Sequence, residues 1–440
     1  MRISITELAA KVASQAAQIP SMYGRVDFSI TPERFATEPD AQTDLDPKFA
    51  ARRPELLAND EQVARIKAYT MLGDLVADAY AALMPKYGFH GLVTMLAQAC
   101  DRGPEQVPAA PPELFRFIQD MERLPAWLDP RLIQEGAQIE RNAYAHRAPF
   151  VIRGGLIATF MNKYSAMPMV MTGAFSDKSA ARRTNETATF FTTTVMPDAL
   201  DRHGATFKSA AMVRLMHSMV RYNLLARDDH WDVKTYGIPI PQVDQMPAGM
   251  ISIFLLAQKA LRHGRTTFTP AERARAELAR YRCFLLGLPE DLLADTPQGI
   301  VDVMLTRTAT LRKGFDENCS TLVGATMNAD LTSDHSLRGH IHTWLERGFA
   351  KVYFVTNFMH GDREAAAKVG VPVSLADYVG AVVAGILISS TMAAYTIAAH
   401  IPRLSQAADR SLVRKLTKQL AGYGHAEFTT NAATYRPAHT

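Results

Sequence analysis

The stretch of sequence that decides the fold is TFKSAAMVRLMHSMVRYNLLA, residues 206–226. It contains no glycine or proline and is rich in helix-forming residues, so it predicts a helix. On that helix Arg214, His217 and Arg221 lie in one stripe, because side chains three and seven residues apart return to the same face. The two arginines disfavour protonation of the histidine between them, and their own charges need anionic partners if they are buried.

A haem would meet both requirements. A neutral imidazole is a good axial ligand of iron, and the two propionates of the macrocycle can pair with Arg214 and Arg221. The residues leave a second interpretation open, in which His217 is a core histidine and the arginines pair with Asp or Glu of neighbouring helices. The spacing suggests a haem site without deciding between the two.

A second segment, DKSAARRTNETATFFTTTV (177–195), predicts another helix. Arg183, Glu186, Thr187 and Phe190 fall on one of its faces. Such a face could line the open side of a haem, where Arg183 or Thr187 donates a hydrogen bond to dioxygen and Glu186 transfers a proton. The alternative is a solvated face with an ordinary pairing of Arg183 and Glu186.

The rest of the chain predicts an all-α fold, because apolar residues recur at three- and four-residue spacing from about Asp60 and β alternation is scarce. We expect a single large helical domain over residues 61–405, an N-terminal extension over 1–60 and a polar C-terminal tail over 406–440. The predicted helices after the first run are 113–122, 130–146, 154–171, 177–196, 205–227, 246–262, 270–287, 297–313, 335–360 and 375–400.

Composition excludes several classes of protein. The net charge of +4 and the lack of a Lys/Arg run argue against nucleic acid as a partner. Three widely separated cysteines argue against a disulfide framework or an iron–sulfur cluster. The N-terminal segment carries Glu7 and Lys11 and does not resemble a secretory signal, so we expect a cytoplasmic protein unless an export segment precedes Met1.

One uncharged segment, VGAVVAGILISSTMAAYTIAA (379–399), is nearly long enough to span a membrane. It is rich in small and hydroxyl residues and has no flanking Trp belt, which favours a helix packed in the centre of a helical protein. We therefore expect no membrane insertion. The sequence does not indicate an oligomeric state.

At four blocks, R-x-x-x-T (183–187), RLMHSMVR (214–221), GIPIPQVDQM (237–246) and YRCFLLGLPEDLL (281–293), the chain resembles the latex-clearing protein and MpaB-type oxygenase family. The resemblance covers about residues 60–400. It implies a globin-like helical core around haem b, with His217 as the proximal iron ligand and Arg214 and Arg221 beside it. It also implies that Arg183 and Thr187 belong to the distal pocket.

The resemblance implies an enzyme that uses O2 to cleave a C=C bond to carbonyl products. Latex-clearing proteins often carry a lysine just before the distal threonine, where this chain has Glu186, so we do not expect a lysine to close off the iron. Because no export signal is seen, a small apolar alkene or isoprenoid is the expected substrate. Two alternatives stay open: a non-catalytic haem protein that senses or carries O2, and a haem-free helical protein that binds lipid or membrane.

Overall fold

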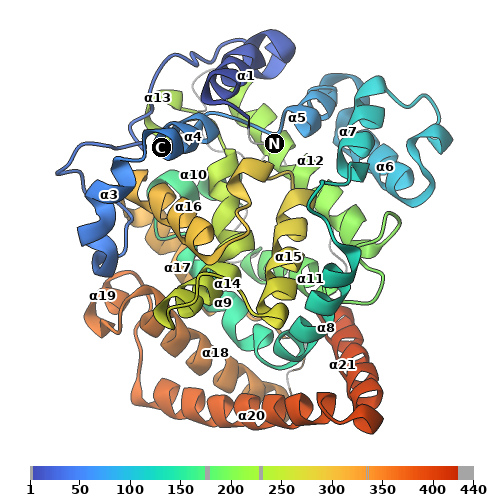
Figure 1. The fold of residues 1–440 in the computed structure, drawn as a ribbon, viewed down its shortest axis with the longest axis vertical. Helices are drawn as coiled ribbons and strands as arrows, with labels where there is room; N and C mark the ends of the chain where they lie inside the picture. The colour runs from blue at the N-terminus through green and yellow to red at the C-terminus, as the bar shows by residue number, and fades with distance from the viewer. Residues whose placement is uncertain (1–2, 174–178, 227–230, 333, 335, 425–440) are drawn as a thin grey trace. The chain divides into compact units, whose positions relative to one another are not determined.

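The structure is a computed structural model, and it describes residues 3–173, 179–226, 231–332, 334 and 336–424. Within those ranges it consists of α-helices and short 3-10 helices (Figure 1), with only two isolated antiparallel bridges, Phe35 to Leu311 and Thr43 to Arg312. The prediction of an all-α fold is therefore confirmed. The helices form two compact units, which are described separately.

Unit 1 comprises residues up to 133 together with 200–314. At its centre α12 (Ala205–Leu225) packs against α5 (Leu75–Ala81) and α6 (Met84–Arg102), while α14 (Gln242–Arg262) packs against α15 (Pro270–Leu285) and α16 (Pro297–Thr310). The remaining α-helices of this unit are α1 (Ile5–Gln18), α2 (Pro20–Tyr23), α3 (Arg53–Leu57), α4 (Asp60–Thr70), α7 (Pro112–Glu122) and α13 (Val233–Tyr236).

The N-terminal segment takes part in the packing of unit 1. Ser4 and Glu7 form a capping box that starts α1, and Leu8 and Val12 of this helix are buried. The buried side chain of Gln15 donates a hydrogen bond to the carbonyl of Met71 (2.8 Å) and accepts one from the N–H of Gly73 (2.9 Å). No helix was predicted in this segment. Through Gln15, α1 holds the loop that leads into α5.

Unit 2 comprises residues 134–199 and the described residues from 315 onward. Its long helices are α18 (Leu337–Phe358), α20 (Leu375–Ala399) and α21 (Pro402–Tyr423). The others are α8 (Pro130–His146), which belongs to this unit from Gln134 onward, α9 (Ala148–Ala158), α10 (Lys163–Thr172), α11 (Ala180–Thr193), α17 (Glu317–Asn328) and α19 (Arg363–Lys368).

Buried ion pairing fixes the core of unit 2. The guanidinium of Arg153 in α9 is fully buried and donates to both carboxylate oxygens of Glu346 in α18. It also donates to the carbonyls of Thr326, Met327 and Ala329 at the end of α17, at 2.7–2.9 Å. One arginine thus joins three helices, because every one of its buried donors requires an acceptor.

Several predicted boundaries were wrong for local reasons. The predicted helix over 154–171 is two helices, because the side chain of Asn162 accepts from the N–H of Tyr164 and starts a new one. Helix α17, capped by Asp316, was missed, and α21 occupies a segment predicted as a polar tail. The predicted start of α11 at residue 177 lies outside the described residues.

The prediction that 379–399 is a buried central helix was also wrong. Helix α20 packs along α18 through one face only, formed by Gly380, Ala381, Ala384 and Ile388. The opposite face exposes apolar side chains, and only 17% of its most apolar window is buried. The small residues of α20 allow close packing against α18, but no further helix covers its opposite face among the described residues.

Candidate functional site

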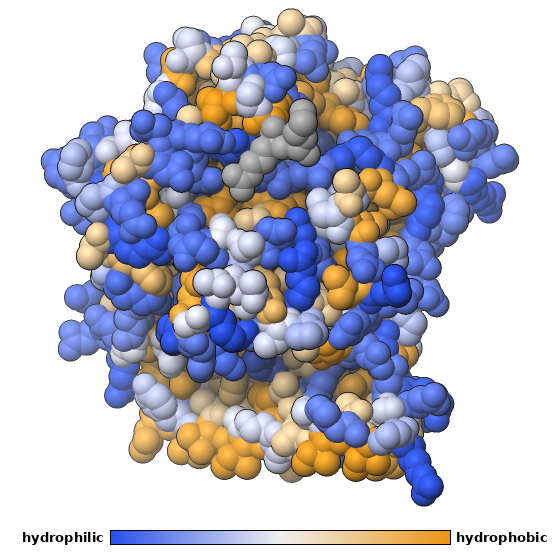
Figure 2. All heavy atoms as spheres, viewed as in Figure 1, coloured by the Kyte–Doolittle hydropathy of each residue, from blue (hydrophilic) through white to orange (hydrophobic). Residues whose placement is uncertain are grey.

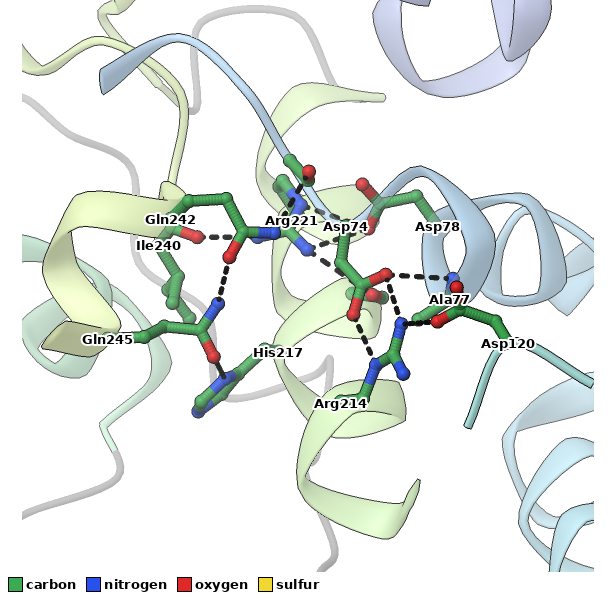
Figure 3. Close-up of polar contacts among 12 residues, drawn as sticks. Asp74, Ala77, Asp78, Asp120, Arg214, His217, Arg221, Ile240, Gln242 and Gln245 are labelled. Atoms are coloured by element: carbon green, nitrogen blue, oxygen red, sulfur yellow. Dashed lines mark hydrogen bonds and ion pairs between the residues drawn. The ribbon is translucent and has the colours of Figure 1, made fainter. Parts of the chain in front are cut away.

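The stripe predicted on residues 206–226 lies in unit 1, on α12, and Figure 3 shows its surroundings. The guanidinium of Arg214 binds the carboxylate of Asp74 through two hydrogen bonds, of 2.6 and 2.8 Å, and donates another to Asp120 (2.8 Å). Asp74 is the residue that caps the start of α5. Although burial opposes its charge, the nearby Arg214 lowers the pKa of Asp74, so this carboxyl group stays ionised.

About two turns further along α12, Arg221 pairs with Asp78 of α5, and both side chains are fully buried. Arg221 donates to Asp78 Oδ1 from Nε (3.0 Å) and from a terminal nitrogen (2.7 Å), and to the carbonyl of Ile240 (2.7 Å). Asp78 also accepts a hydrogen bond of 2.5 Å from the hydroxyl of Tyr23. Burial opposes the charge of Arg221, yet the carboxylate of Asp78 raises the pKa of that guanidinium above its ordinary value.

Close approach of the backbone makes room for these pairs at two glycines. Gly287, in the block 281–293, has φ +84°, and a Cβ there would lie 2.7 Å from Asp74 Oδ2 and 2.8 Å from Arg214 Nε. A Cβ on Gly73 would overlap the Tyr23 hydroxyl and the carboxylate of Asp78. The glycines therefore belong to the same arrangement as the ion pairs.

Between the two arginines, His217 faces α14. Its Nδ1 lies 3.4 Å from Oε1 of Gln245, whose amide nitrogen donates to Oε1 of Gln242 (3.2 Å); Gln242 in turn donates to the carbonyl of Gly73 (3.1 Å) (Figure 3). Because Gln242 receives the amide N–H of Gln245, the oxygen of Gln245 is the atom that faces the imidazole. That oxygen can only accept, so Nδ1 carries the proton of the neutral ring.

In this tautomer Nε2 of His217 carries no proton and has a free lone pair. Among the described residues Nε2 has no hydrogen-bond partner, and the side chain keeps part of its accessible surface. Burial, and then the charge of Arg221, lower the pKa of His217 to about 4. The imidazole is therefore neutral at physiological pH, and it presents one oriented, unprotonated nitrogen.

These observations test whether the residues fit a haem. An axial ligand must be a neutral imidazole whose other nitrogen donates to a hydrogen-bond acceptor, and His217 with Gln245 has this form. Both arginines pair with aspartates of neighbouring elements, as the alternative interpretation expected. The pairs hold α12 in place on α5, and binding of propionates by Arg214 and Arg221 stays a prediction.

Arg183, Glu186 and Thr187 lie in unit 2, on α11. Arg183 donates to Glu186 Oε2 (2.8 Å), so the expected pairing exists, but in a buried rather than a solvated setting. The other carboxylate oxygen, Oε1, is buried without a hydrogen-bond partner within the described chain. The hydroxyl of Thr187 donates to the carbonyl of Arg183 (3.0 Å). The structure thus brings these three together on α11, as it brings Arg214, His217 and Arg221 together on α12.

Sequence reasoning missed Gln245, Gln242 and the aspartates of the site. Gln245 and Gln242 do lie in the block GIPIPQVDQM, which the resemblance singled out, and their spacing of three places both side chains on one helix face. Asp74 and Asp78 have the i, i+4 spacing of a helix face, but their partners lie 140 and 143 residues away. No local sequence pattern predicts a partner so far away in the chain.

Comparison with known proteins shows which class of fold and which family this chain has. The structure is similar to that of the latex clearing protein LCP in its closed state, with a TM-score of 0.55 and 16% identity, covering 80% of this chain and 91% of that one. The family described as ER-bound oxygenase mpaB/B'/rubber oxygenase, catalytic domain, matches residues 143–389. The chain belongs to this oxygenase family.

A curated relative adds a specific comparison. The chain is 24% identical to the rubber oxygenase of Streptomyces sp. (strain K30) over an alignment 267 residues long, which covers 55% of this chain and 65% of that protein. The match thus spans slightly less than two thirds of the relative. All four blocks on which the resemblance rested lie within the matched family region, so the family prediction is confirmed.

Proposed function

We propose that the protein is a haem b-dependent oxygenase that uses O2 to cleave a C=C bond of a small apolar alkene or isoprenoid. Both oxygen atoms of O2 would enter the products, one in each of two carbonyl groups, so the reaction balances without a further reductant. Membership in the oxygenase family supports the use of O2. The observation that carries the cofactor assignment is the neutral His217 imidazole with an oriented, unpartnered Nε2.

Bound haem would supply the dioxygen chemistry, and the residues of the chain would hold and adjust it. His217 would hold the haem iron through Nε2. Gln245 fixes the rotation of the ring and its tautomer, because its oxygen accepts from Nδ1. Asp74 and Asp78 neutralise the arginines that flank His217, so no unpaired positive charge opposes a cationic iron.

For Glu186 we propose that the buried, unpartnered Oε1 accepts a proton during turnover. A buried acceptor without a partner is costly, and such cost is often retained at functional positions. The distal roles of Arg183 and Thr187 rest on the family pattern and form part of the same proposal.

The first experiment is an absorption spectrum of the purified protein as isolated, reduced, and reduced under carbon monoxide. A stoichiometric Soret band in the wild type and its loss in His217→Ala would support the assignment. His203→Ala is the matched control, because His203 is a unit 1 histidine whose Nδ1 contacts only the carbonyl of Cys100, outside the site. A colourless protein that cannot be reconstituted, or full haem content in His217→Ala, would overturn it.

Catalysis is tested separately with ¹⁸O2 and short isoprenoid alkenes. Two carbonyl products, each carrying one labelled oxygen, are expected by mass spectrometry. Reversible binding of O2 with no product from any alkene would instead identify a carrier or sensor.

A further inference from the structure

Helix α20 presents a long, uncharged apolar face that no described part of the chain covers. Val382, Ile386 and Ile397 are 60%, 64% and 63% exposed. Figure 2 shows orange stretches along the edge of the molecule where Figure 1 places α20, and we call the exposed apolar residues of this face the band. Further exposed apolar side chains continue the band at Leu375, Val379, Val383, Leu387, Ile401 and Leu404.

The band has helical periodicity and extends past the end of α20. Its residues recur at helical spacing from Leu375 to Leu387 and again from Ile397 to Leu404, with the exposed Ser389 and Ser390 in the interval between the two groups. A 25-residue helix is about 37 Å long, and patches of this extent are uncommon on monomeric soluble proteins. It is long and apolar enough to cross a bilayer, but its burial is too low for a core helix.

The packing of α20 determines how it could meet a membrane. Gly380 lies against the ring of Trp344, and a Cβ on Gly348 would lie 2.7 Å from the carbonyl of Asp377, so α18 occupies the whole of one face. Lys351 of α18 also donates to Asp377 (3.1 Å). A helix held in this way cannot be surrounded by lipid, but it can lie in the plane of an interface with its free face in the acyl region.

Two observations select a lipid surface over a protein partner. The face is aliphatic, with no aromatic or arginine side chain of the kind that anchors protein interfaces. The helix that follows is basic: on α21, which packs against α20, the only acidic residue is Asp409, and it pairs with Arg141 (2.7 Å). The exposed basic residues there are Arg403, Arg410, Arg414, Lys415 and Lys418.

From this geometry we propose that the protein docks on membranes containing anionic phospholipids, with α20 lying in the interface and the exposed basic residues of α21 contacting the headgroups. Trp344, which is 40% exposed beside Gly380, supplies an interfacial aromatic side chain next to α20. The proposal does not depend on the haem assignment, since it uses only residues of unit 2.

The test is flotation of the full chain with vesicles of phosphatidylcholine alone and of phosphatidylcholine with phosphatidylglycerol. We expect the wild type to float with the anionic vesicles. The affinity of V382D/I386D for these vesicles should be lower by at least about tenfold. R403Q/R410Q should lose part of the preference for anionic vesicles. L124D is the matched control, because Leu124 is 71% exposed but lies outside the band.

Helical circular dichroism and the midpoint of thermal unfolding confirm that each variant is folded. The proposal would be overturned if the wild type stayed in solution with both kinds of vesicle. It would also be overturned if V382D/I386D floated to the same extent as L124D. A dimer by analytical ultracentrifugation that V382D/I386D dissociates while no variant binds vesicles would overturn it as well, because the face would then cover a second copy of the chain.

Discussion

The buried pair of Arg221 and Asp78 should govern the stability of unit 1, and Asp78→Asn tests this. Both side chains have zero exposed surface, and the substitution keeps the shape while removing the charge. Arg221 would retain the carbonyls of Pro239 and Ile240 as acceptors, but no carboxylate. Breaking one partner of a buried pair costs about 3–5 kcal/mol, because the remaining charge is left without compensation.

The structure offers a matched comparison on the same helix. Lys208 of α12 pairs with Asp101 of α6 at 2.6 Å, but these side chains are 40% and 52% exposed. Solvent screens such a pair, so Asp101→Asn should cost about 1 kcal/mol or less. The two variants thus remove the same kind of contact, an aspartate bound to a cation on α12, and differ mainly in burial.

Urea denaturation followed by circular dichroism measures both costs. We expect Asp78→Asn to lower the free energy of unfolding at least threefold more than Asp101→Asn does. D78L/R221M, which replaces both charges with apolar groups, should recover much of the loss. Equal and small effects of the two single variants would refute the reasoning, since burial would then not decide the cost of losing the aspartate.

Further predictions concern His217 and its neighbours. The pKa of His217 is lowered to about 4, so the folded haem-free protein takes up its proton later than the unfolded chain does; stability should therefore fall by about 1.4 kcal/mol per pH unit from about pH 6.5 towards pH 4. Urea titrations at pH 7 and pH 5 should show this loss in the wild type, and His217→Asn should lack it. Gln245→Leu should keep the helical content but shift the Soret and ferrous–CO bands and weaken haem retention about tenfold. Gln245→Glu keeps an acceptor for Nδ1 and should restore haem retention. Unchanged spectra in both variants would show that the amide does not orient the imidazole. Gly287→Ala should lower stability by about 1–3 kcal/mol, because φ is +84° and the new Cβ meets Asp74 and Arg214; a neutral result by thermal denaturation would contradict the packing described. Glu186→Gln should slow alkene cleavage with unchanged haem content, and loss of haem would assign the residue a structural role.

What the sequence could predict of the fold depends on how local the determining interactions are. Helices α15 and α16 are capped by Thr269 and Thr296, whose side chains accept from the backbone N–H three residues on. Both helices were predicted to begin at the correct residue, 270 and 297. Helix α17 has the same signal in Asp316, with buried apolar positions at Cys319, Leu322 and Val323, and could have been found by the same rule. The low burial of α20 could not be predicted from local sequence, because it depends on how much of the helix surface α18 covers.

The candidate site shows the same division. Spacing alone placed Arg214, His217 and Arg221 on one face of a helix, but two interpretations of that face predicted the same pattern. The geometry separates them residue by residue. The arginines have aspartate partners from α5 and α7, whereas the histidine has one nitrogen oriented by Gln245 and one without a partner among the described residues. The haem hypothesis therefore rests on the imidazole rather than on the cations. Paired arginines hold the helix that presents His217, and a change in them should first alter stability and only then cofactor binding.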